Sequence, residues 1–184
     1  QLLTLLVAPI LTRLFEPDTW GVLAIFVSIT GILGVIACLR YELAIMLPEK
    51  DEESANLLGV SLSFSILISL LTVPIIWFGK DPILRWLNAP GLAPYLWLVP
   101  IAVFLQGVFL ALNYWNSRTR HFGRLSIARV ISSFSTSLGK LGFGFAGYTS
   151  AGTMIGATVA GSAISTTILG GQIWRDDRKI FLQS

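Results

Sequence analysis

Apolar residues occur along the chain in long blocks that short polar connections separate. Two of these blocks, 21–39 and 57–79, contain no charged residue, and each exceeds the roughly 18 residues that mark a membrane-spanning helix. Between Arg129 and Arg175 the only charged residue is Lys140, which leaves room for two crossings with a turn at GYTSAG. The pattern therefore predicts an all-α, polytopic membrane helix bundle of about six transmembrane helices, at Gln1–Leu14, Thr19–Leu47, Ser54–Phe78, Tyr95–Ser117, Leu125–Tyr148 and Ala151–Trp174.

The connections carry residues that start and stop helices. Asp18 in FEPDTWG and Ser54 in LPEKDEES are each expected to cap the N-terminus of the following helix. The segment GKDPILRWLNAPGLAP contains too many Pro and Gly residues to span a membrane. Its Trp86 and Leu87 are expected at the level of the lipid headgroups.

The amino-acid composition also indicates a membrane protein and argues against a soluble domain or a nucleic-acid-binding protein. Hydrophobic residues make up 54% of the 184 residues and charged residues 12%, about half the charged fraction of a soluble domain. The basic residues lie in short loops beside apolar helices, so we expect no nucleic-acid partner. The single cysteine, Cys38, excludes a disulfide within this chain.

Basic residues are distributed unevenly between two alternating sets of connections. The connections after the first, third and fifth helices hold three of them: Arg13, Lys80 and Arg85. The other connections and the C-terminal segment hold nine: Arg40, Lys50, Arg118, Arg120, Arg124, Arg129, Arg175, Arg178 and Lys179. The positive-inside rule therefore predicts that this second set and the N-terminus face the cytoplasm.

Polar side chains follow helical spacing in two of the predicted helices. The third helix carries a stripe of Ser61, Ser65, Ser69 and Thr72, and the fifth carries Arg129, Ser133, Thr136 and Lys140. A stripe of hydroxyl groups either joins neighbouring helices or faces a water-filled cavity, and both interpretations of the third helix stay open.

Two further helices have distinctive positions. The fourth carries Gln106 and Asn113 one heptad apart, so both can face the same side. The sixth has Gly152, Gly156 and Ala160 at intervals of four, a pattern that predicts close approach to another helix.

Two cations lie within or beside predicted membrane segments. Lys140 is about eight residues, roughly 12 Å, from the outer end of its helix, which favours a cavity-facing position. Arg40 falls near the cytoplasmic end of the second helix, where it either reaches the headgroups or lines a cavity open to the cytoplasm. A guanidinium there suits a phosphate group, because it stays charged and makes paired hydrogen bonds. Glu42 points elsewhere on the helix and is expected to be solvated or interfacial.

The chain lacks the residues that most catalytic sites need. His121 is the only histidine, and no carboxylate lies in the third to sixth helices. We therefore expect no enzymatic activity, no metal site and no cofactor.

Three sequence blocks carry a resemblance to a known family. LTRLFEPDTWG, RYELAIMLPEKDEESANLL and LVPIAVFLQGVFLALNYWNSRTRHFGRLSIARV, in this order, resemble the Wzx-type oligosaccharide flippase family of O-antigen and exopolysaccharide translocases. This family belongs to the superfamily of multidrug, oligosaccharidyl-lipid and polysaccharide exporters. The resemblance implies a two-lobe exporter in the bacterial plasma membrane. Residues 1–184 would be its N-terminal transmembrane lobe, and since the chain opens in apolar sequence without methionine, we expect a fragment that lacks the start of the first helix and the C-terminal lobe.

The resemblance also implies an activity. Such flippases move an undecaprenyl-diphosphate-linked oligosaccharide from the cytoplasmic to the periplasmic leaflet, and polysaccharide polymerase or assembly proteins are possible partners. Arg13 and Arg40 match positions where the lipid II flippase of the same superfamily also has arginines. The expected substrate-binding residues are Arg40, Lys140, Arg13, Gln106 and Asn113.

Other functions stay open at this point. A cation-coupled drug exporter of the same superfamily would need an intramembrane carboxylate, and Glu42 is the candidate. A non-transport membrane subunit of a polysaccharide assembly complex is a further alternative. An intramembrane glycosyl- or acyltransferase would need catalytic residues in long outer loops, and the predicted outer loops are short.

Overall fold

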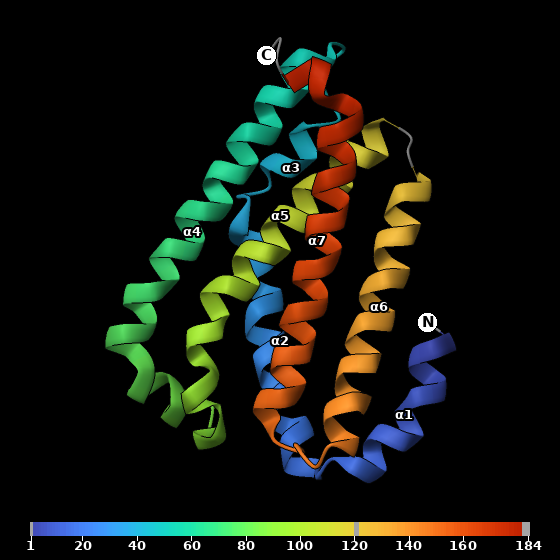
Figure 1. The fold of residues 1–184 in the computed structure, drawn as a ribbon. Coiled ribbons are helices and arrows are strands. Elements are labelled where there is room, and N and C mark those ends of the chain that lie inside the picture. The colour runs from blue at the N-terminus through green and yellow to red at the C-terminus, as the bar shows by residue number, and fades with distance from the viewer. Residues whose placement is uncertain (1, 120–121, 182–184) are drawn as a thin grey trace.

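The computed structural model describes residues 2–119 and 122–181, and this part of the chain is helical without strands (Figure 1). Arg120 and His121 lie outside the described residues. The elements are α1 (Leu2–Leu14), α2 (Pro17–Ala37), α3 (Tyr41–Ala44), α4 (Asp51–Trp86), the 3-10 helix η1 (Pro90–Leu98), α5 (Val99–Arg118), α6 (Phe122–Phe145) and α7 (Ala151–Phe181). The predicted all-α class is therefore confirmed.

Four described segments are long and apolar enough to cross a membrane: Pro17–Ala37, Asp51–Trp86, Pro90–Arg118 and Ala151–Asp177. The class of polytopic membrane helix bundle is confirmed by these segments. The helix α6 has 24 residues and runs beside α7 along its length (Figure 1), but with Arg124, Arg129 and Lys140 in its sequence it is not one of these four segments. The described part of α1 has 13 residues and packs against α6.

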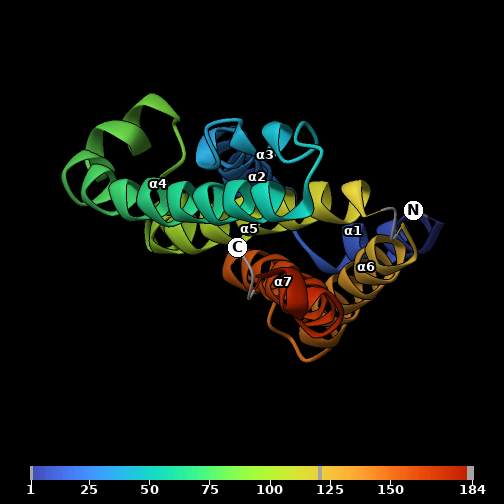
Figure 2. The same cartoon turned by 90° about the horizontal axis from the view of Figure 1, so that it is seen from above.

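The helix α5 lies at the centre of the bundle. Residues four apart along it are buried and form one face: Val99, Val103, Gly107, Ala111 and Trp115. Its neighbours are α2, α4 and α7. Seen from above, α4 and α5 lie side by side, while α6 and α7 form a second pair at an angle to them (Figure 2).

The helix α4 is longer than predicted at both ends. Its 36 residues extend about 54 Å, well beyond the roughly 30 Å of a bilayer core. It begins at Asp51 and not at Ser54, because three carboxylates occupy its first turn, where the helix dipole favours negative charge. Ser54 is buried and does not cap it. Past Gly79 the helix continues through Pro82 and bends near its C-terminal end (Figure 1).

The predicted second helix, Thr19–Leu47, is wrong at both ends. It begins at Pro17, since proline suits the first helical position, and Asp18 lies in the first turn instead of capping it. At the other end α2 stops at Ala37, because Leu39 and Arg40 adopt positive φ angles of 48° and 64° that no right-handed helix can contain. Arg40 therefore precedes the short α3 and does not lie within a transmembrane helix.

This break also changes the environment of Glu42. Its side chain is 1% exposed, so the expectation of a solvated or interfacial residue is wrong. The turn at Arg40 folds α3 back against α4 and α5. Ile45 thereby joins a buried cluster with Cys38 and Trp115, and Glu42 is carried inward with it.

The connection from α3 to α4 is fastened to the end of α5 by Arg118. Its guanidinium donates hydrogen bonds to the carbonyls of Pro48 (2.7 Å) and Ile45 (3.3 Å). It also pairs with the Asp51 carboxylate at 3.0 Å. A planar fork with several donors suits such a set of acceptors.

The hydroxyl stripe of α4 joins this helix to α5. Ser65 Oγ donates to the carbonyl of Phe104 at 3.3 Å, and Ser69 Oγ donates to that of Pro100 at 2.8 Å. Ser65 is buried, and a Cβ on Gly107 of α5 would collide with its hydroxyl. These contacts favour helix packing over a water-filled cavity for this stripe.

Close approach of α6 and α7 uses different small residues from those expected. A Cβ on Gly161 would collide with Thr136 Oγ1, and one on Gly139 would lie 3.2 Å from Ala157 Cβ. Gly156 has open space where a side chain would project. Gly152 instead faces the Tyr95 ring. The spacing of four correctly indicated a small-residue contact, but the contacting stripe is shifted by one residue around the helix.

Candidate functional site

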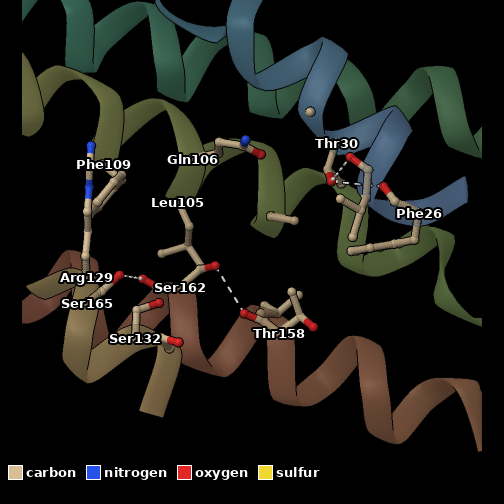
Figure 3. A pocket seen from close by; sticks show the side chains of 15 residues that line it. Phe26, Thr30, Leu105, Gln106, Phe109, Arg129, Ser132, Thr158, Ser162 and Ser165 are labelled. Atoms are coloured by element: carbon tan, nitrogen blue, oxygen red, sulfur yellow. Dashed lines mark hydrogen bonds between the residues drawn. The ribbon is translucent and has the colours of Figure 1, made fainter. Parts of the chain in front are cut away.

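A cavity of about 430 Å³, here called the central cavity, lies between α2, α5, α6 and α7. The side chains and backbone that line it come from Phe26, Val27, Thr30, Gly31, Ala102, Leu105, Gln106, Phe109, Arg129, Ser132, Ser133, Thr158, Val159, Ser162 and Ser165 (Figure 3).

Hydroxyl groups supply most of the polarity of the central cavity. Thr30 donates to the Phe26 carbonyl at 2.9 Å, and Ser162 donates to the Thr158 carbonyl at 3.1 Å. Ser132 of α6 donates across to the Gly161 carbonyl at 3.3 Å. A hydroxyl that donates its hydrogen in this way keeps its lone pairs as acceptors. The walls can therefore accept hydrogen bonds from a ligand that itself carries hydroxyl groups.

Arg129 is the cation of the central cavity. It is exposed, and its side chain extends from α6 towards α5 beside Phe109 (Figure 3). No carboxylate lines the cavity, and none of the ion pairs formed by the described residues involves Arg129. A guanidinium in this setting can bind a phosphate through paired hydrogen bonds. Arg129 is not among the residues expected from the sequence to bind substrate, although it begins the polar stripe of its helix.

Gln106, one of the residues expected from the sequence to bind substrate, provides an amide in the same cavity. It is exposed into the space between the helices and comes from α5. Its side chain lies over Gly34 of α2, where an added Cβ would be 2.7 Å from Gln106 Cδ. The missing side chain at position 34 thus leaves the room that Gln106 occupies.

Lys140 lines a second cavity, of about 310 Å³, between α1, α2 and α6. Ser133 lines both cavities, so the polar stripe of α6 connects them. Arg13 is exposed at the end of α1, and Arg40 is exposed between α2 and α3. Neither lines either cavity.

Asn113 is half-buried on α5 and also lies outside both cavities. Its backbone carbonyl accepts a hydrogen bond from Ser117 Oγ at 2.9 Å. The structure therefore brings Gln106 and Lys140 to neighbouring cavities and leaves Arg13, Arg40 and Asn113 apart from them. Binding of substrate by any of these five residues stays a prediction.

The described side chains form no group of three His, Cys, Asp or Glu residues that could hold a metal ion. The chemistry that the central cavity offers is that of one guanidinium, one amide and several hydroxyls in an otherwise apolar wall. Such a surface can hold and orient a polar ligand, and its fixed groups suit an anion that carries hydroxyls.

Comparison with known proteins gives one match. Residues 10–176 match a family that is described as "Polysaccharide biosynthesis protein". No curated protein and no solved structure matches the chain.

Proposed function

Because the chain belongs to the polysaccharide biosynthesis protein family, we propose that it is part of a transporter that flips lipid-linked oligosaccharide across a membrane. The substrate in this proposal is an undecaprenyl-diphosphate-linked oligosaccharide of the kind moved by Wzx-type flippases. It passes from the cytoplasmic to the periplasmic leaflet of the bacterial inner membrane. The N-terminus faces the cytoplasm, and the chain catalyses no covalent chemistry.

The central cavity is the observation that carries this proposal. Its one charged side chain is Arg129, and its other polar groups are hydroxyls and the Gln106 amide. A diphosphate needs a cation when it leaves water, since an unpaired charge in hydrocarbon is very costly. Sugars carry many hydroxyls, which can donate to the serine and threonine oxygens of the wall. The cavity therefore complements both parts of the headgroup.

The mechanism follows from this complementarity. The diphosphate binds at Arg129 while the sugar lies against Gln106 and Ser162, and the lipid chain stays in the bilayer beside the bundle. A second lobe of the exporter supplies the opposite wall, and rocking of the two lobes exposes the loaded cavity first to one side and then to the other. Polymerase or assembly proteins then receive the product at the periplasmic face.

One observation favours a second candidate, the cation-coupled exporter. The Glu42 carboxylate is buried, and its Oε2 atom has no hydrogen-bond partner among the described residues. A buried carboxylate of this kind can bind a cation during a transport cycle. Glu42 lies outside the central cavity, however, so it would couple transport and not bind the cargo.

The proposal is tested by export of surface polysaccharide in cells that depend on the full-length protein. Arg129→Gln should abolish export at a normal membrane level of the protein, and lipid-linked oligosaccharide should accumulate in the inner leaflet. Arg129→Lys should retain part of the activity, because lysine keeps the positive charge but lacks the planar guanidinium that makes paired hydrogen bonds. Arg85→Gln is the matched control, since Arg85 is exposed and lines neither cavity. Normal export by Arg129→Gln would contradict the proposal. If Glu42→Gln makes the cells sensitive to drugs and Arg129→Gln does not, the cation-coupled exporter is favoured.

A further inference from the structure

The second cavity is lined by Ala8, Leu11, Trp20, Ser133, Thr136, Ser137 and Lys140. Its polar side chains are an ammonium, three hydroxyls and an indole. Each of them can donate a hydrogen bond, and no carboxylate is among the described residues that line the cavity. The lining therefore offers donors and positive charge to whatever fills the cavity.

Lys140 has no anionic partner among the described residues. The ion pairs of the described chain use the carboxylates of Asp51, Asp176 and Asp177, and none includes Lys140. The helix that closes the cavity, α1, contains no Asp or Glu in its sequence. A half-buried ammonium without an anion is costly inside an apolar bundle and in most cases marks a functional position.

Trp20 is a second residue that lines this cavity and carries an unpaired donor. Its indole nitrogen is buried and has no hydrogen-bond partner within the described part of the chain. A buried donor that lacks an acceptor loses its bond to water without replacement. Trp20 and Lys140 thus line one small space, and each carries a donor with no acceptor among the described residues. A group that carries negative charge and acceptor oxygens would supply the anion that Lys140 lacks.

The position of the cavity relates it to the central cavity. Arg129 and Lys140 lie eleven residues apart on the same face of α6, which is about 16 Å along the helix. Ser133 lies between them and lines both cavities. The polar stripe of α6 therefore leads from one cation to the other.

We infer that the second cavity is an anion site that takes a phosphate group, held by Lys140 with Trp20 and the α6 hydroxyls. This inference rests on the proposed function, in which the diphosphate of the lipid-linked sugar binds at Arg129, and adds that a phosphate group moves from Arg129 to Lys140 during transport. Free inorganic phosphate offers the same chemistry and is the other source. A lysine ammonium binds phosphate as a compact point charge, with three donors that can turn towards the ligand.

Binding to the full-length protein in phosphatidylcholine nanodiscs tests the inference. Radiolabelled pyrophosphate and farnesyl diphosphate serve as probes, and equilibrium dialysis gives the number of sites and their affinities. Lys140→Gln should remove one site relative to the wild type, whereas Lys140→Arg should keep it. Trp20→Phe should weaken that site about fivefold or more, because it removes the N–H and keeps a ring. Lys50→Gln, at an exposed lysine, should change nothing.

The outcomes separate this inference from the proposed function. If Lys140→Gln keeps every site, the second anion site does not exist. If Lys140→Gln loses a site while Arg129→Gln exports normally, the second site stands and the proposed function fails. Loss of farnesyl diphosphate binding alone identifies the lipid headgroup as the ligand, and loss of pyrophosphate binding alone identifies the free anion. Loss of both shows that the site recognises the diphosphate group with or without a lipid. Each of these losses supports the site.

Discussion

Trp115 and Asp177 lie 62 residues apart in the chain and are joined by a hydrogen bond of 3.0 Å from the indole Nε1 to the carboxylate Oδ2. Trp115 is fully buried in α5, and Asp177 of α7 is 9% exposed. Arg124 of α6 pairs with the same carboxylate at 3.3 Å and with Asp176 at 2.9 Å. One buried carboxylate thus ties three helices together at the end of the bundle where α5 and α7 finish.

Asp177→Asn should lower the free energy of unfolding by about 1.5 to 3 kcal/mol, because it removes the charge that Arg124 and the indole bind. Thermal unfolding of the protein in nanodiscs measures the change. Asp176→Asn is the matched control. Its side chain is 40% exposed, so solvent screens the pair and the loss should stay under about 1 kcal/mol. Equal losses in the two variants would show that the Asp177 network contributes no more than a surface pair.

Gly161→Ala should destabilise the contact between α6 and α7. The new Cβ would collide with Thr136 Oγ1 and lie 3.3 Å from the Ser132 carbonyl, so the helices must separate, at a cost of about 1 to 3 kcal/mol. Gly156→Ala tests the same change where nothing lies within 4 Å. It should be neutral or stabilise by up to about 1 kcal/mol through helix propensity. Thermal unfolding of both variants measures the change in stability. A Gly161→Ala protein as stable as the wild type would argue against this packing of α6 on α7.

Arg40→Gly should fold at least as well as the wild type. Arg40 holds φ at 64°, a left-handed conformation that costs other residues roughly 1 kcal/mol and glycine almost nothing. We expect the free energy of unfolding to stay equal or rise by up to about 1 kcal/mol, as measured by thermal unfolding. A clear loss of stability would mean that the guanidinium itself holds the α2–α3 connection.

The same position tests the substrate contact expected from the sequence. If Arg40 captures the diphosphate at the membrane surface, Arg40→Ala and Arg40→Gly lose export and Arg40→Lys keeps part of it. Because the glycine variant should fold well, its export reports on the guanidinium and not on the backbone. Full export by Arg40→Gly would remove Arg40 from the set of substrate-binding residues.

Cysteine labelling should establish the orientation of the bundle. Cys38 is fully buried, and its thiol donates to the Gly107 carbonyl at 3.3 Å, so it should not react with a water-soluble maleimide. Lys50 precedes α4 and Asp81 lies near the C-terminal end of the same helix; both are exposed, and the positive-inside rule assigns these two ends to opposite faces. Asp81→Cys should be labelled in intact spheroplasts, and Lys50→Cys only after lysis. The reverse result would place the N-terminus in the periplasm.

The helical class and most of the elements could be predicted because apolar blocks and their connections are local features. The break after Ala37 could not, since the sequence CLRYELAIM contains neither Gly nor Pro. There the burial of Ile45 beside Trp115 outweighs local helix propensity. A similar tertiary effect places Glu42 in the interior.

The candidate site could be predicted only in part. The spacing of polar residues in the sequence predicts the polar stripe of α6. The spacing does not determine which neighbouring helix the stripe faces. The packing of α1 against α6 and of α5 against α7 decides that Arg129 and Lys140 belong to two cavities. Serines on α4 carry the same signal and turn out to bind backbone carbonyls of α5.

The absence of a side chain at Gly34 has a consequence for specificity. A residue there would push Gln106 away from α2 and into the space that the ligand needs. In the proposed transporter, a substitution at this position would therefore change the bulk of headgroup that the cavity accepts without any change in the residues that touch it. Position 34 does not line the cavity and would act on substrate choice through Gln106, which does. It is therefore a target for engineering transporters towards larger or smaller glycans.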